Sequence, residues 1–169
     1  MAWTDSRVFT QAIKNPLLQH VNPGSLTSPT GYSDLVATDV VNAALFNNSV
    51  TPDRDAVVGS TGFNTGTWLT ANEVIDTLNS NWVSGGRALA TKAFTSGTSI
   101  VNFTAANLAG AGTLTITNAF GCMVYDNSIT AGTVAKQGLC FNYFGGAQSV
   151  TSGTFTIVWD ATGVFKFTN

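Results

Sequence analysis

Thr154-Phe-Thr-Ile-Val-Trp159 decides the fold class, because its polar and apolar residues alternate in the way that gives a strand one buried and one exposed face. Thr113-Leu-Thr-Ile-Thr117 has the same alternation. Asp160-Ala-Thr-Gly163 follows the first stretch and is expected to form a hairpin turn between the last two strands, with Gly163 available for a positive φ. The end of the chain is therefore predicted to consist of antiparallel strands.

The same pattern extends over much of the chain. Gly, Asn and Ser clusters separate short apolar stretches, and the Gly- and Thr-rich segments 59–68 and 145–153 are expected to be loops. Several short strands joined in this way favour an antiparallel β-sandwich or a flattened barrel. The predicted strands lie at 39–46, 88–95, 98–104, 113–117, 119–126, 137–144, 153–159 and 163–168.

Two short helices are expected outside these strands. The first covers residues 4–14, where Val8, Phe9, Ala12 and Ile13 fall on one helical face. The second lies near 71–79, because Thr70-Ala-Asn-Glu73 is typical of a capping box.

Residues 15–34 hold three of the four prolines and are expected to form an extended arm. The arm could drape over a neighbouring subunit or form a surface loop on its own domain, and the sequence does not separate the two. The predicted organisation is a helix and arm over 1–34 and a β-sandwich domain over 35–169.

The composition favours a protein that works within an assembly. Only 9% of the residues are charged, against about 25% in an average soluble protein. Eleven Phe and four Trp residues supply enough apolar surface for a packed core. The net charge of −2 and the scattered Lys and Arg residues argue against nucleic-acid binding, and no apolar stretch is long enough for a membrane span. The start of the chain has no signal-peptide pattern, so we expect the protein to remain in the cell that makes it.

The sequence points away from catalysis, metals and cofactors. His20 is the only histidine and lies in the predicted arm, far from any nucleophile with a base. Asp53 and Asp55 flank Arg54, which favours a turn in which Asp53 caps backbone amides over a calcium loop. Cys122 and Cys140 lie on consecutive predicted strands, and free, buried thiols are favoured over a disulfide. We therefore predict a protein that is not an enzyme and needs no cofactor.

Residues from about 35 to 168 resemble a family of small virion structural proteins from tailed bacteriophages. Each shared motif is short, and their order along the chain carries the resemblance. They are Thr51-Pro-Asp-Arg-Asp55, Asn72-Glu-Val74, Gly85-Gly86 before Leu89, Tyr125-Asp126, Phe144-Gly-Gly-Ala-Gln148, Gly153-Thr-Phe-Thr-Ile157, Trp159-Asp-Ala-Thr-Gly163 and Val164-Phe165.

This resemblance implies a structural component of the virion, assembled in the bacterial cytoplasm. A capsid decoration (cement) protein is the expected role, with the major capsid protein as partner and a homotrimer as the favoured oligomer. We expect partner contacts at apolar residues outside the predicted sandwich. These are Trp3, Phe9, Pro23, Leu26, Pro29 and Tyr32.

Two other functions remain open from the sequence. A tail, neck or fibre-associated subunit would use exposed aromatic residues such as Phe63, Trp68 and Phe144 for adhesion. A carbohydrate-binding or carbohydrate-active module would need two carboxylates across a cleft. Its candidate acids are Glu73, Asp76, Asp126 and Asp160.

Overall fold

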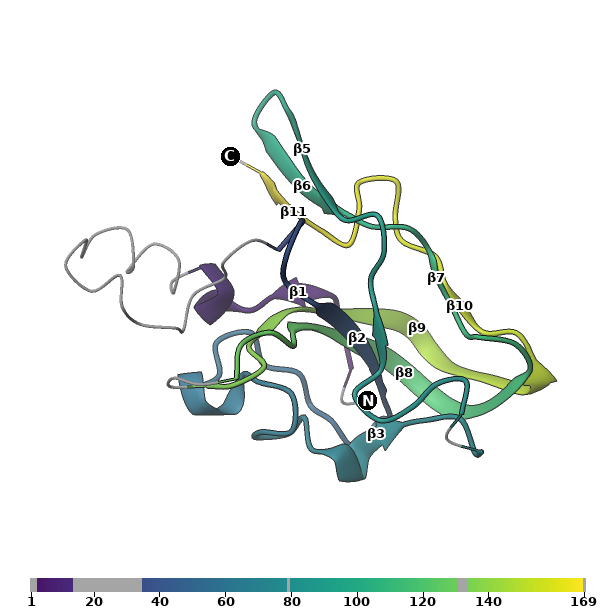
Figure 1. The fold of residues 1–169 in the computed structure, drawn as a ribbon. Coiled ribbons are helices and arrows are strands. Elements are labelled where there is room, and N and C mark those ends of the chain that lie inside the picture. Colours follow the sequence, from purple (N-terminus) through teal and green to yellow (C-terminus); the bar gives the residue numbers. More distant parts are fainter. Residues whose placement is uncertain (1–2, 14–34, 79, 131–133, 169) are drawn as a thin grey trace.

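The computed structural model describes residues 3–13, 35–78, 80–130 and 134–168, which form a mainly β, antiparallel fold (Figure 1). This confirms the predicted fold class. The strands are β1 (Arg7–Val8), β2 (Val41–Phe46), β3 (Glu73–Val74), β4 (Arg87–Ala88), β5 (Ala93–Gly97), β6 (Ile100–Thr104), β7 (Leu108–Ala109), β8 (Leu114–Asp126), β9 (Gly138–Gly153), β10 (Thr156–Ile157) and β11 (Phe165–Thr168). Single 3-10 turns lie at Val58–Ser60 and Thr70–Asn72.

The strands form one large and two small sheets. The large sheet has the order β1-β9-β8-β2-β3, and β4 also pairs with β2. The order β11-β6-β5 forms a three-stranded sheet, and β10 pairs with β7. In Figure 1 the small sheets lie across one side of the large one, which gives a sandwich-like arrangement without a closed barrel.

The central strands of the large sheet are buried on both faces. In β2, Val41, Ala43 and Leu45 belong to a core that includes residues of the small sheets. Ala44 and Phe46 belong to a second core on the opposite face. Side chains on both faces of these strands are buried, so their sequences are continuous apolar runs without polar alternation.

Trp3 and Phe9 are fully buried in the second core. The Trp3 indole nitrogen donates a hydrogen bond to the Asn47 carbonyl oxygen at 2.9 Å. The ring centroids of Trp3 and Trp68 are 5.7 Å apart, and those of Phe9 and Phe141 are 5.4 Å apart. Their predicted position outside the sandwich is therefore wrong. In the described part of the chain, the N-terminal segment and loops cover this face of the sheet in place of a further strand layer, and the two rings supply its apolar surface.

Of the two expected helices, the first is shorter than predicted and the second does not form. Residues 10–13 are helical, but β1 precedes them, so the helix does not begin at residue 4. The helix expected near 71–79 is wrong, because the 3-10 turn Thr70–Asn72 leads directly into β3. The Glu73 carboxylate accepts hydrogen bonds from Ser84 Oγ and the Gly85 amide, both at 2.7 Å, in place of capping a helix.

The segment 145–153, expected to be a loop, is part of β9. The pairing of β8 with β9 is irregular there, since Gly121 is opposite Tyr143 whereas Ala119 is opposite Gln148. Gly145 and Gly146 have φ angles of 80° and 153°, which other residues rarely adopt. The glycines thus form a β-bulge, and the strand continues beyond it. The Gly-rich composition of this segment reflects the bulge and not a loop.

The Asp160–Gly163 turn is confirmed, but the hairpin is wrong. The Gly163 amide donates to the Asp160 carbonyl oxygen at 2.8 Å, and Gly163 has φ 100°. The strands on either side do not pair with each other, because β10 pairs with β7 and β11 pairs with β6. The turn therefore joins a strand of the two-stranded sheet to a strand of the three-stranded sheet.

Cys122 and Cys140 are free and buried, as predicted. Cys122 lies opposite Asn142, and Cys140 lies opposite Val124, so the thiols are diagonal neighbours. Burial raises the pKa of Cys122 to about 12 and raises that of Cys140 well above its usual value. A high pKa leaves little thiolate at neutral pH.

We therefore expect both thiols to stay unreactive toward a disulfide reagent at pH 8 in the folded protein. Both should react promptly in denaturant, which serves as the control. The absorbance of the released thiolate gives the count directly. Fast reaction of one thiol before unfolding would contradict the buried position of that strand.

Candidate functional site

One face of the β5–β6–β11 sheet carries exposed apolar side chains. Opposite residues of an antiparallel pair share a face. The register places Phe103 on the central strand opposite both Phe94 and Phe165, and Val101 opposite Phe167. In Figure 1 the β5–β6 hairpin extends beyond the large sheet, with the C-terminal strand beside it.

The aromatic side chains on this face form a continuous row. The Phe103 ring is fully buried, and its centroid lies 5.1 Å from those of Phe94 and Phe165. Phe165 contacts Phe167 at 5.6 Å. The row begins in the core and continues onto the surface, where Phe94, Val101 and Phe167 are 47%, 42% and 37% exposed. We call these three exposed residues the hairpin face.

The two faces of this sheet differ in chemistry. Thr95, Asn102, Lys166 and Thr168 alternate with the aromatic residues and therefore lie on the opposite face. A contiguous apolar patch on a soluble protein marks a contact surface more often than an accident of sequence. The hairpin face is thus the candidate partner interface.

Sequence reasoning missed these residues as contacts. It assigned Phe94, Val101 and Phe167 to strands, and their alternation with polar residues could have placed them on one face. The sequence does not indicate that the described residues leave this face exposed. Of the contacts it did predict, Trp3 and Phe9 are core residues, and Pro23, Leu26, Pro29 and Tyr32 lie outside the described residues.

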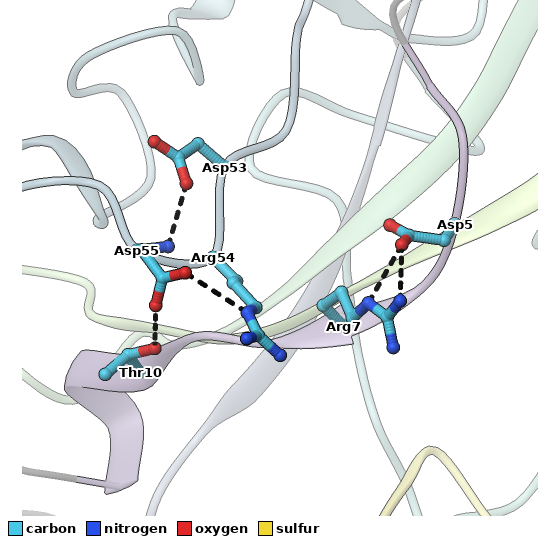
Figure 2. Close-up of polar contacts among 6 residues, drawn as sticks. All are labelled: Asp5, Arg7, Thr10, Asp53, Arg54 and Asp55. Carbon is cyan, nitrogen blue, oxygen red and sulfur yellow. Dashed lines mark hydrogen bonds and ion pairs between the residues drawn. The ribbon is translucent and has the colours of Figure 1, made fainter.

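The Thr51-Pro-Asp-Arg-Asp55 turn holds the N-terminal segment (Figure 2). Asp53 Oδ1 accepts a hydrogen bond from the Asp55 amide at 2.9 Å, which confirms the predicted capping role. Asp55 accepts a hydrogen bond from Thr10 Oγ1 at 2.6 Å and pairs with Arg54 at 3.2 Å. The Thr10 amide also donates to the Arg54 carbonyl oxygen at 2.9 Å. These contacts connect the turn to the residues that follow β1.

Replacing Thr10 with valine should raise the pKa of Asp55 toward its ordinary value. The Thr10 hydroxyl is the largest cause of the lowered pKa of this carboxylate, ahead of Arg54. A carboxylate that loses a donor to its charged form is protonated more easily. NMR titration of the Asp55 side chain would measure the change. Arg54→Gln is the comparison variant and should also raise the pKa, because Arg54 supplies both a hydrogen bond and a positive charge to this carboxylate. An unchanged pKa in Thr10→Val would contradict the assignment.

The aromatic residues predicted for adhesion and the carboxylates predicted for carbohydrate chemistry are mostly held within the fold. Phe63 and Trp68 are buried and cannot serve as adhesive residues on the surface, whereas Phe144 is half-buried. Four carboxylates were considered for carbohydrate chemistry, and three of them accept hydrogen bonds from backbone amides. Glu73 binds the 84–85 loop, Asp76 accepts from the Thr115 amide at 2.9 Å, and Asp160 accepts from the Thr162 amide at 2.8 Å. Asp126 accepts from the Ser128 amide at 2.8 Å and contacts the Asp39 carboxyl group.

Within the described ranges, no group of three or more His, Cys, Asp or Glu side chains is placed to hold a metal ion. None of the helices described there is long and apolar enough to cross a membrane. Comparison with protein-family models, with curated proteins and with solved structures finds no match to this chain.

Proposed function

We propose that this protein is a structural, non-enzymatic component of a tailed-bacteriophage virion, namely a capsid decoration protein that binds and stabilises the head shell. The observation that carries the proposal is the hairpin face, an exposed apolar surface on a sheet that extends from the sandwich. The resemblance of its short motifs to those of small phage virion proteins suggests the biological setting.

The chemistry of the surface supports a role in assembly. A chain with only 9% charged residues has few groups to desolvate when it packs against other subunits. Each subunit bound to the mature shell and not to its disassembled form stabilises the shell by mass action. We propose that the hairpin face contacts the major capsid protein and that copies of the chain associate as a homotrimer.

The location and copy number in purified particles test this proposal. Hundreds of copies spread over the head in cryo-electron microscopy would support a decoration protein. A ring or a few copies at the neck or tail would replace it with a tail-associated structural role. Absence from the particle would overturn the virion assignment itself, and sedimentation of the isolated chain would test the trimer.

A matched pair of variants tests the hairpin face. Val101→Ser removes apolar surface from the hairpin face. Val57→Ser is the same substitution at a valine that is 73% exposed and lies outside this sheet. Val101→Ser should lower the number of copies retained on shells, and Val57→Ser should not. Melting temperatures would show that both variants are folded. Equal retention of the two would place the shell contact elsewhere.

A further inference from the structure

A groove runs along the open side of the sandwich. Its walls are the middle of β9, from Asn142 to Val150, and the C-terminal segment 154–160. The first hollow has a volume of about 650 Å³. A second hollow of about 720 Å³, between the β1 region and β11, shares four lining residues with it. These are Ser6, Asn142, Asp160 and Gly163.

Aromatic side chains with fixed positions line the first hollow. The Phe144 ring centroid lies 6.3 Å from that of Phe155, and both rings pack against the core that includes residues of the small sheets. The Trp159 indole nitrogen donates to the Ala106 carbonyl oxygen at 3.0 Å. Rings held in this way present a rigid apolar surface at little entropic cost on binding.

Neutral polar groups lie between the rings. Asn142 and Gln148 offer amides, and Ser149, Thr154 and Thr156 offer hydroxyls, each of which can donate or accept a hydrogen bond. Rings beside neutral amides and hydroxyls match a ligand with apolar C–H faces and many hydroxyl groups. We propose that this groove binds a neutral oligosaccharide.

The charges around the groove favour a neutral ligand over an anionic one. Asp160 is the charged residue of the first hollow and already accepts hydrogen bonds from Thr162. No Lys or Arg is among the residues that line the first hollow. Arg7, Arg54 and Lys166 line the second hollow, where Arg7 pairs with Asp5 at 2.8 Å and Arg54 pairs with Asp55 at 3.2 Å (Figure 2). Phosphate-rich ligands are bound largely by Lys and Arg side chains. The lining of the first hollow therefore favours a neutral ligand.

The backbone of β9 disfavours an extended peptide as the occupant. A peptide that adds a strand needs a regular edge of amides and carbonyl groups. Here the glycine bulge at 145–146 makes the edge of β9 irregular along the groove. Recognition by side chains, as in sugar binding, does not need a regular edge.

A glycan array probed with the full chain tests the proposal. The array would carry neutral oligosaccharides (glucose, galactose, mannose and N-acetylglucosamine oligomers of four to six units), sialylated and phosphorylated glycans, and control peptides. We expect retention of at least one neutral oligosaccharide. Retention of acidic glycans or peptides alone, or of nothing at millimolar concentrations, would overturn it.

Two variants place any binding in the groove. Gln148 is exposed, so Gln148→Ala should keep the melting temperature and weaken binding of the retained oligosaccharide by about five- to tenfold, the effect of one lost hydrogen bond. The Trp159 indole N–H resonance, assigned with Trp159→Phe, should shift during titration. Val57→Ala, outside the groove, is the control. Unchanged affinity in Gln148→Ala together with a static Trp159 signal would exclude the groove as the site.

This inference does not depend on the virion assignment. Oligosaccharide binding could be found in a protein located on the head, the tail or neither. Conversely, a decoration protein could leave every glycan on the array unbound. The two proposals therefore succeed or fail on separate measurements.

Discussion

Replacing Trp3 with alanine is expected to lower the free energy of unfolding by about 3–5 kcal/mol, the range for a large aromatic residue removed from a core. Trp3 is fully buried, and its ring lies within 6.4 Å of the centroids of Trp68, Phe141 and Tyr143. In the variant the Asn47 carbonyl oxygen also loses the hydrogen bond that it accepts from the Trp3 indole N–H. Urea unfolding of the isolated protein, followed by far-UV circular dichroism, would measure the change.

This experiment separates a core residue from a partner contact. If Trp3 served only to bind another subunit, the isolated variant would be as stable as the parent protein. Phe9→Ala should destabilise the chain to a similar extent, because Phe9 packs against Trp68 and Phe141 in the same core. Val57→Ala is the control and should stay within about 0.5 kcal/mol. A loss below about 1 kcal/mol for both aromatic variants would contradict this packing.

The strands were predictable because alternation in the sequence reports one-sided burial. Leu114 and Ile116 are buried as the Thr113–Thr117 pattern requires, and Ile157 follows the same rule. The pattern fails where both faces of a strand are covered. In β8, every residue from Gly121 to Asp126 is buried, so the sequence shows an apolar run without a preferred face.

The contacts of the N-terminal segment could not be predicted, because they depend on long-range packing. Local spacing predicts Val8 and Phe9 on one face of a helix. In the structure, Arg7 and Val8 instead form a strand that pairs with the edge of β9. A strand edge formed by residues more than 130 positions away leaves no local signal. The hairpin face was missed for the same reason, since exposure depends on which elements cover it.

Raising the pH from 4.5 to 8 is expected to remove about 1–3 kcal/mol of stability at a second site, the buried pair Asp39 and Asp126. Burial raises the pKa of Asp126 to about 6, and the nearby Asp39 carboxylate adds to this effect. The Lys92 ammonium group, which donates to the Asp39 backbone carbonyl oxygen, partly opposes it. In the unfolded chain the pKa of Asp126 returns to the ordinary value of 3.8.

The sign follows from these two values. Between about pH 4 and 6 the folded protein binds the proton of Asp126 more tightly than the unfolded chain does, so stability from this group is full below pH 4 and declines through pH 6. Above that range the ionised carboxylate is buried, and its contribution no longer changes.

Asp126→Asn should therefore abolish this loss. Asparagine keeps an oxygen for the Ser128 amide, which Asp126 Oδ1 accepts at 2.8 Å, and its amide can donate to the Asp39 carboxylate. The variant should match the parent near pH 4.5 and exceed its stability by about 1–3 kcal/mol at pH 8, as measured by urea unfolding.

Asp160→Asn provides the opposite control. The Thr162 hydrogen bonds lower the pKa of Asp160, so its carboxylate stabilises the fold above the ordinary carboxyl pKa and loses this effect as the pH falls. Asp160→Asn should consequently weaken the protein at pH 8 and approach the parent at low pH. If Asp126→Asn behaved in the same way, burial would not be what governs Asp126. A gain at pH 8 that disappears at pH 4.5 would instead identify the junction of β2 and β8 as the site where neutral pH destabilises this fold.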